Sequence, residues 1–305
     1  MIVIIFGILA VSTGSIFVRY AQEDAPSIVI AAYRLGLATL FLAPLALFKH
    51  RTELASIQGR DRWLAVGSGI FLALHFATWI SSLEYTTVVS SVVLVSTAPL
   101  WVALLSPVTV KEPLTKAIMI GMGLAFVGVV VVGISDVCSI ESGELVCPSF
   151  NEFVRGEAFI GDLLALAGAW MAAGYLLIGR RLRGGISLIP YIFVVYGIAA
   201  LVLIGLMFAS GQSATGYAPQ TYVWLILLAL VPQIMGHSSF NWALGYLTAA
   251  VVSITLLGEP IGSAVLAYVL LDETPTILKI IGAILILAGI FAASRGEAAR
   301  KANRS

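Results

Sequence analysis

Apolar residues run along this chain in ten stretches, separated by segments that hold charges, glycine or proline. The stretches cover residues 2–19, 28–48, 63–82, 87–106, 116–134, 159–179, 187–209, 221–244, 248–271 and 277–294. Continuous runs of this length predict membrane-spanning helices, because a hydrocarbon core about 30 Å thick needs roughly 20 apolar residues per helix. A transmembrane β-barrel would instead alternate apolar and polar residues. The pattern predicts an all-α integral membrane protein with ten transmembrane helices.

Composition supports this class. Hydrophobic residues make up 60% of the chain and charged residues 11%, against roughly 45–50% and 25% in soluble proteins. So few charges cannot cover the surface of a soluble protein of this length. The formal net charge of +1 gives no reason to expect a nucleic-acid partner. The lipid bilayer and a small-molecule substrate are the expected partners, and the oligomeric state is not predicted.

Orientation follows from the distribution of Lys and Arg. With a cytoplasmic N-terminus, 13 of the 17 basic residues fall on the inner side, and only Arg19, Arg155 and Lys279 fall on the outer side. Both termini are therefore predicted in the cytoplasm. Residues 135–158 become an external loop, and residues 295–305 become a cytoplasmic tail.

The two halves of the chain repeat one another. An offset of 161 positions aligns residues 63–134 with 224–295 without a gap, and it pairs Trp63 with Trp224, Pro99 with Pro260, Glu112 with Glu273, and Gly128 with Gly289. The halves 1–134 and 159–294 each hold five predicted helices. Because five is odd, the second half must enter the membrane in the opposite direction. Such inverted repeats are typical of alternating-access transporters with a site near the midplane.

The repeated segments also carry a family resemblance. EPIGSAVLAYVLLDETPT and the helix after it closely resemble the second-repeat signature of the EamA family in the drug/metabolite transporter superfamily, and TAPLWVALLSPVTVKEPLT is similar to its first-repeat counterpart. The arginine within AAYRLGLATL is also similar to the family pattern. The resemblance covers residues 2–294. It implies a ten-helix carrier for small metabolites, often an exporter of amino acids or related compounds, without implying one substrate.

Prolines lie about halfway along two predicted helices. Pro99 and Pro260 each remove a backbone donor, so the carbonyls of Val95 and Leu256 should lack their helical partners. Such carbonyls are tolerated at membrane depth only against protein or a wet cavity. A structural kink is the alternative, but the equivalent positions in both halves favour a pair of gating hinges.

Four ionisable residues lie at membrane depth: Arg34, His75, His237 and Glu259. Each is costly in hydrocarbon and is therefore a functional candidate. We expect a structural role for Arg34, in an ion pair with Glu259 or with Glu84. Glu259 is either a packing residue or a proton-coupling group that works by protonation.

Large side chains with polar edges predict a central substrate-binding cavity. His75 and Trp79 are four residues apart, as are His237 and Asn241, so each pair shares one helix face. The alternative for each histidine is an ordinary interhelical hydrogen bond. No metal site is predicted, because no cysteine or carboxylate pair accompanies the histidines, and no cofactor is indicated. The predicted substrate-binding residues are His75, Trp79, Trp101, Trp170, His237 and Asn241.

Glycines in the last helix of each half recur at a seven-residue spacing, Gly121 with Gly128 and Gly282 with Gly289. Small residues on one face let helix backbones approach closely in lipid. These two helices are predicted to form scaffold.

The two cysteines, Cys138 and Cys147, fall in the predicted external loop. Because such a loop faces an oxidising compartment, we expect a disulfide between them. Two independent thiols are the alternative.

The side chains at depth also narrow the substrate. A carrier for strong anions would offer several convergent basic residues, whereas only Arg34 is available. Aromatic faces and hydroxyls favour ammonium or neutral polar groups. The sequence thus predicts a multi-pass transporter of a bacterial-type cell membrane for neutral or zwitterionic metabolites, amino acids first, and the family resemblance implies export. The alternatives are an exporter of drugs or cationic compounds, and an intramembrane enzyme, for which no catalytic motif is recognisable.

Overall fold

The computed structural model describes residues 2–109, 116–135, 138–141, 144–146, 156–247 and 249–302. Its secondary structure is helical apart from a hairpin of β1 (Ser139–Glu141) and β2 (Glu144–Val146). Within these residues, seven helical segments are long and apolar enough to cross a membrane: Ile2–Gln22, Ser27–Lys49, Gly59–Tyr85, Val88–Leu105, Glu157–Leu182, Leu188–Ala209 and Pro219–Leu244. Shorter apolar helices cover Met119–Val132, Gly258–Leu271 and Ile277–Gly289. The predicted all-α membrane class is confirmed.

Several predicted stretches are divided into shorter helices. The elements in chain order are α1 (Ile2–Ser12), α2 (Gly14–Gln22), α3 (Ser27–Lys49), α4 (Arg51–Ser56), α5 (Gly59–Tyr85), α6 (Val88–Val95), α7 (Ala98–Thr109), α8 (Lys116–Ser135), α10 (Glu157–Leu182), α11 (Leu188–Ala209), α12 (Pro219–Leu228), the π-helix η1 (Ala229–His237), α13 (Ser238–Leu244), α14 (Ala249–Thr255), α15 (Gly258–Leu271) and α16 (Ile277–Ala302).

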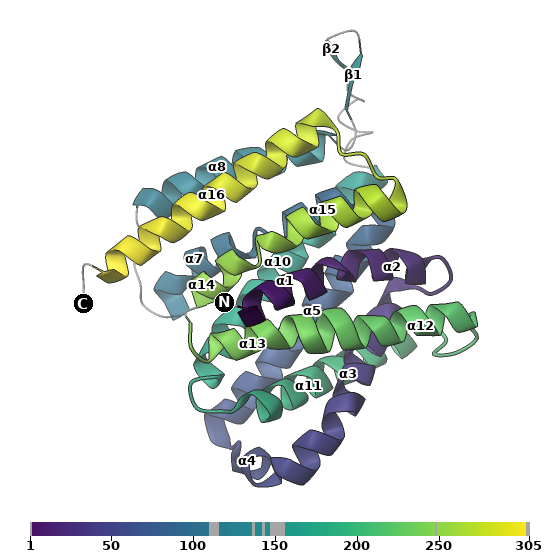
Figure 1. Ribbon diagram of the computed structural model, residues 1–305, viewed down its shortest axis with the longest axis vertical. Coiled ribbons are helices and arrows are strands. Elements are labelled where there is room, and N and C mark those ends of the chain that lie inside the picture. The colour runs from purple at the N-terminus through teal and green to yellow at the C-terminus, as the bar shows by residue number, and fades with distance from the viewer. Residues whose placement is uncertain are drawn as a thin grey trace.

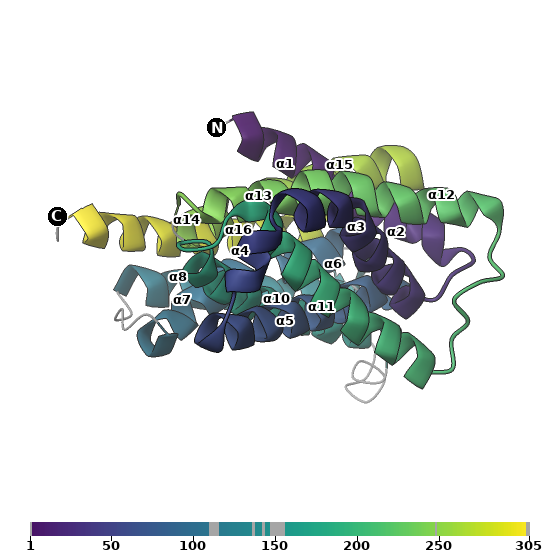
Figure 2. The same cartoon turned by 90° about the horizontal axis from the view of Figure 1, so that it is seen from below.

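The helices pack in pairs that join distant parts of the sequence (Figures 1 and 2). α5 packs along α10, α3 packs along α11, and α1 lies against η1, α13 and α15. α8 and α16 lie side by side at one edge of the bundle (Figure 1). The main core cluster draws buried residues from every helix except α4, α8 and α16 among the described elements. The central elements are therefore held on several sides by other helices.

Glycines set the distance between α8 and α16. A Cβ atom added at Gly128 would lie 2.7 Å from the carbonyl oxygen of Gly282, and one added at Gly289 would lie 2.5 Å from that of Gly121. These distances are shorter than any normal contact, so only the absence of a side chain permits the approach. The glycine spacing predicted a close approach of helix backbones, and the structure shows that α8 and α16 approach each other.

The external-loop prediction is only partly covered by the structure. Cys138 follows α8 and precedes the hairpin, whereas Cys147 lies outside the described residues. The Cys138–Cys147 disulfide therefore remains a prediction.

A first test addresses the α8–α16 contact. Gly128→Ala should destabilise the protein by about 1–3 kcal/mol, because the added methyl group must push two packed backbones apart. Gly123→Ala, on the same helix, is the matched control, since a Cβ atom there has nothing within 4 Å and alanine is the better helix former by about 1 kcal/mol. Thermal unfolding in detergent measures both. Equal melting temperatures for the two variants would contradict the packing described.

Candidate functional site

A cavity lies at the centre of the bundle, where two broken helices face each other. It offers about 60 Å³ to the centres of water molecules, which is room for roughly four to six waters. Its wall comes from α5, α10, η1, α13 and the breaks in the α6–α7 and α14–α15 segments. The lining residues are His75, Trp79, Val95, Ser96, Ala98, Pro99, Ala172, Tyr175, Leu176, His237, Phe240, Asn241, Leu256 and Glu259.

The two helix breaks occur at equivalent places, just before Pro99 and Pro260. α6 ends at Val95 and α7 begins at Ala98, while α14 ends at Thr255 and α15 begins at Gly258. The prolines explain both breaks, because neither can donate the hydrogen bond that would continue the helix.

The structure adds one detail to the proline prediction. The carbonyl of Leu256 cannot bond to Pro260, which has no amide hydrogen, and instead accepts the amide hydrogen of Glu259 at 2.9 Å in a tighter turn. Val95, Leu256 and Pro99 line the cavity, whereas Pro260 is buried outside its wall.

The structure brings four of the six predicted binding residues to the cavity wall. The ring centres of His75 and His237 lie 6.4 Å apart, although the two side chains come from distant helices. The His75 ring is nearly parallel to that of Trp79, with 6.2 Å between centres. His75 Nδ1 is hydrogen-bonded to the carbonyl of Gly168 at 2.9 Å. This bond orients the ring toward the cavity, so an interhelical hydrogen bond and a place in the cavity wall coexist.

Trp101 and Trp170 lie outside the cavity wall, so their predicted position is wrong. Their rings pack edge to face, with 4.9 Å between centres. Trp101 Nε1 donates to the hydroxyl of Thr97 at 3.2 Å, and Trp170 is 52% exposed on the surface of α10. The two indoles therefore pack against each other outside the cavity wall.

Sequence reasoning missed the tyrosines that surround Asn241. The Tyr175 hydroxyl donates to Asn241 Oδ1 at 2.5 Å, and Asn241 Nδ2 donates to the Tyr196 hydroxyl at 3.1 Å. Tyr196 is in hydrogen-bond contact with Ser238 as well. The hydroxyl of a tyrosine within an apolar helix must find a hydrogen-bond partner. That requirement could have indicated from the sequence that these tyrosines belong to a polar network. The network links α10, α11 and α13 behind the cavity.

Glu259 is the one carboxylate on the cavity wall. Within the described residues, its side chain makes no hydrogen bond and no ion pair within 4 Å. Its backbone carbonyl approaches the hydroxyl of Ser12 at 3.5 Å. No three His, Cys, Asp or Glu side chains in this part of the chain are grouped as metal ligands.

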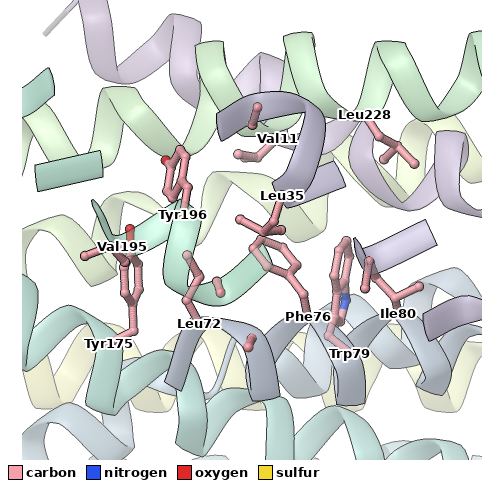
Figure 3. Packing of buried hydrophobic residues seen from close by; sticks show 14 of the residues in the cluster. Val11, Leu35, Leu72, Phe76, Trp79, Ile80, Tyr175, Val195, Tyr196 and Leu228 are labelled. Carbon is pink, nitrogen blue, oxygen red and sulfur yellow. The ribbon is translucent and has the colours of Figure 1, made fainter. Parts of the chain in front are cut away.

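Arg34 does not form the predicted ion pair. It is 1% exposed, its Nε donates to Gln233 Oε1 at 2.8 Å, and its Cζ atom lies 4.1 Å from the centre of the Phe76 ring. Neither Glu84 nor Glu259 reaches it within 4 Å, and Glu84 instead accepts the amide of Ser27 at 3.1 Å. An amide and aromatic faces surround this cation in place of a carboxylate. Figure 3 shows Phe76 on α5 pointing toward Leu35, the residue after Arg34 on α3, with Trp79 one turn farther along α5.

The two ends of the bundle carry related contacts. At one end, Arg19 donates to the carbonyls of Leu83 and Thr86, and it lies 3.4 Å from Glu273. At the other end, Arg180 donates to the carbonyl of Leu244 at 2.7 Å. The 161-position offset converts Arg19 into Arg180 and Leu83 into Leu244.

Glu273 strengthens the first of these ends. Its second carboxylate oxygen accepts the amide of Val88 at 2.9 Å, at the start of α6. The loop after α15 is thereby tied to α2 and to the beginning of α6.

Comparisons with known proteins agree with this architecture. The family model described as "EamA-like transporter family" matches residues 1–134 and 159–295. An uncharacterized transporter of Archaeoglobus fulgidus is 25% identical over 283 residues, covering 90% of each chain. The uncharacterized transporter YyaM of Bacillus subtilis is 24% identical over 270 residues, covering 87% of this chain and 83% of its own. A solved crystal structure at 18% identity covers 98% of this chain and 97% of its own with a TM-score of 0.66, which shows a shared fold.

A second test addresses the Asn241 network. Asn241→Ala should destabilise the protein by about 1–3 kcal/mol, because the buried hydroxyl of Tyr175 loses its acceptor. Ser210→Ala is the control, since the Ser210 hydroxyl bonds only to a carbonyl of its own helix. Unfolding followed by intrinsic fluorescence compares them. An Asn241→Ala protein as stable as the control would show that the network does not hold the helices together.

Proposed function

The chain belongs to the EamA-like transporter family, and we propose that it carries small neutral or zwitterionic metabolites, amino acids first, out of the cell by alternating access. It is a multi-pass protein of the cell membrane. The observation that carries the proposal is the central cavity, which is enclosed by broken helices from both halves and lined by aromatic, histidine, amide and carboxylate groups.

We propose ten spans in two inverted repeats, residues 1–134 and 159–294, with both termini in the cytoplasm. The pairing of helices supports this architecture. The 161-position offset relates α5 to the segment that contains η1, and it relates α1 to α10. The contact of α5 with α10 therefore corresponds to the contact of η1 with α1. α3 with α11, and α8 with α16, each pair an element with its own counterpart. The equivalent proline breaks support it independently.

The related contacts at the two ends support alternating access. Arg19 and Arg180 occupy corresponding positions, and each donates to a carbonyl at the end of a helix from the neighbouring segment. Release of one set of contacts at a time would open the cavity to one side only. The hinges are the breaks before Pro99 and Pro260, where the helices have already lost continuity.

The cavity wall favours the proposed substrates. Trp79, Tyr175 and Phe240 supply aromatic surface for an apolar body, and Glu259 supplies an acceptor for an ammonium group. Among the described residues the wall holds no Lys or Arg, so a sugar phosphate or nucleotide would lack the several basic residues that such anions require. The small volume fits a solute of a few heavy atoms in this conformation.

A second candidate function is export of cationic drugs. The Glu259 carboxylate among aromatic rings in the described wall favours it, because a desolvated cation is attracted both to a carboxylate and to the faces of aromatic rings. An intramembrane enzyme is disfavoured, since the family and the related transporters point to transport rather than to catalysis.

Counterflow in proteoliposomes tests the proposal with a panel of amino acids, cationic drugs and sugar phosphates. We expect exchange of at least one amino acid. Trp79→Ala or His75→Ala should weaken its binding by about 1–3 kcal/mol through loss of stacking or a hydrogen bond.

Trp170→Ala is the matched control, because this indole lies outside the cavity. It should keep the affinity of the unaltered protein. Exchange of sugar phosphates alone, or equal affinities for the Trp79 and Trp170 variants, would overturn the proposed substrate site.

A separate test concerns proton coupling at Glu259. Glu259→Gln keeps the shape of the side chain and removes its exchangeable proton. If the carboxyl group binds and releases a proton in each cycle, the variant should still bind substrate while the pH dependence of its transport flattens. Counterflow should be measured from about pH 5.5 to about pH 8.5, so that the pH profiles of the variant and the unaltered protein can be compared. A normal transport rate with the original pH profile would reduce Glu259 to a packing residue.

A further inference from the structure

Buried hydrogen-bond donors without acceptors gather on one side of the cavity. In the described part of the chain, the buried side-chain nitrogens without a hydrogen-bond partner are Arg34 Nη1, Trp79 Nε1 and Gln233 Nε2. They come from α3, α5 and η1, which meet behind the cavity wall. Since unmatched buried donors are costly, three of them on neighbouring elements indicate a place for an acceptor, although the Ser15 hydroxyl of α2 is also buried without a partner.

The guanidinium of Arg34 forms the centre of this cluster. Gln233 fixes it from one side through the 2.8 Å bond to Nε, and Gln233 itself is fully buried. The Gln233 side chain also lies within reach of the Tyr196 hydroxyl. An amide can orient a guanidinium, but it cannot neutralise the charge. The protein therefore presents an oriented cation that forms no ion pair within 4 Å among the described residues, although Glu259 is a charged neighbour farther away.

Trp79 connects this cation to the cavity. It lines the cavity wall, and its ring centre lies 5.6 Å from the Cζ atom of Arg34. His237 lies close by as well, with its ring 5.2 Å from that of Phe76, the ring beneath the guanidinium. A solute held in the cavity is thus separated from Arg34 by a single layer of side chains.

Gly14 of α2 borders the unpaired nitrogen. A Cβ atom added at Gly14 would lie 3.4 Å from Pro232 Cβ, 3.6 Å from Trp79 Cη2 and 3.7 Å from Arg34 Nη1, all ordinary contacts. In the described part of the chain, no acceptor reaches Arg34 Nη1 from this side.

We propose that Arg34, oriented by Gln233, is a carboxylate-binding subsite of the central cavity, which receives the acidic group of the transported solute after Trp79 moves aside. This inference rests on the proposed function, because it names the part of a zwitterionic solute that the protein recognises. The ammonium group would then face Glu259, the carboxylate in the described cavity wall. A zwitterion satisfies both buried groups, whereas an amine or a neutral amide satisfies at most one.

Binding of a simple carboxylate tests the subsite without requiring transport. The probe is sodium butyrate, compared with butyramide in sodium chloride of the same ionic strength, on the full-length protein in detergent. Butyrate should raise the melting temperature in a saturable manner by about 2–5 °C. Butyramide, of nearly the same shape, should have no such effect. Equal shifts with the two compounds would overturn the subsite.

Two variants locate the effect. Arg34→Gln should abolish the response to butyrate. Gln233→Glu supplies an anion from the protein itself, so it should melt at or above the temperature of the unaltered protein and should no longer respond to butyrate. This second variant keeps the proposal testable if Arg34→Gln does not fold. A Gln233→Glu protein that is less stable, or that still responds fully to butyrate, would contradict the assignment. Gly36→Ala, at an open position of α3, is the neutral control.

Counterflow of leucine and of isoamylamine, which lacks the carboxylate, separates this inference from the proposed function. Absence of leucine exchange in a protein that binds butyrate through Arg34 would remove the amino-acid assignment and leave the subsite. Leucine exchange that is unchanged in Gln233→Glu would remove the subsite and leave the proposed function.

Discussion

Hydrocarbon offers no hydrogen-bond partner, so every polar group at membrane depth must find one within the protein or in an internal cavity. This constraint explains why the irregular elements are found together. The breaks before Pro99 and Pro260 and the π-helix around Pro232 all border the same cavity or its supporting layer. Each interrupts normal helical bonding, and none is placed on the outside of the bundle. The elements that weaken a helix thereby also build the polar centre that transport requires.

Helix positions and the proline breaks could be predicted from the sequence because each depends on local chemistry. Residues 28–48 and 159–179 were expected as helices, and α3 and α10 cover Ser27–Lys49 and Glu157–Leu182. The face that each side chain presents was harder to predict, since these helices are apolar nearly all round and give little indication of which side is inward. His75 and Trp79 were placed correctly because a shared face at i and i+4 needs no knowledge of rotation. Trp101 and Trp170 were misplaced because a tryptophan is stable both in a cavity wall and at a lipid-facing surface.

Arg34 shows the same limit for charges. The sequence predicts how deep each residue lies in the membrane, and on that basis Glu84 and Glu259 were reasonable partners. It does not predict which way a helix face turns, and the face of α3 that carries Arg34 turns its guanidinium toward Gln233 and Phe76. An amide partner leaves the positive charge available, whereas a carboxylate partner would have neutralised it. A buried ion pair is costly to break, so a permanently paired arginine would be poorly suited to binding and releasing a solute. The incomplete pairing is therefore the property of this residue that is most relevant to transport.

The contact between α8 and α16 is a different kind of contact from those at the two ends of the bundle. The first is fixed backbone packing, whereas the others are hydrogen bonds that can be broken. α8 and α16 touch through backbone atoms at their glycines, a contact that no side-chain rotation can release. The ends are closed by arginine side chains that donate to carbonyls near helix C-termini, Leu83 in α5 and Leu244 in α13, where a cation also interacts favourably with the helix dipole. Hydrogen bonds of this kind are worth roughly 0.5–1.5 kcal/mol each, so one end can open while the packed core stays intact. In the proposed alternating access, contacts of the same type hold both ends, with Glu273 adding to the Arg19 end, so a bound solute could change which end opens without requiring a large binding energy.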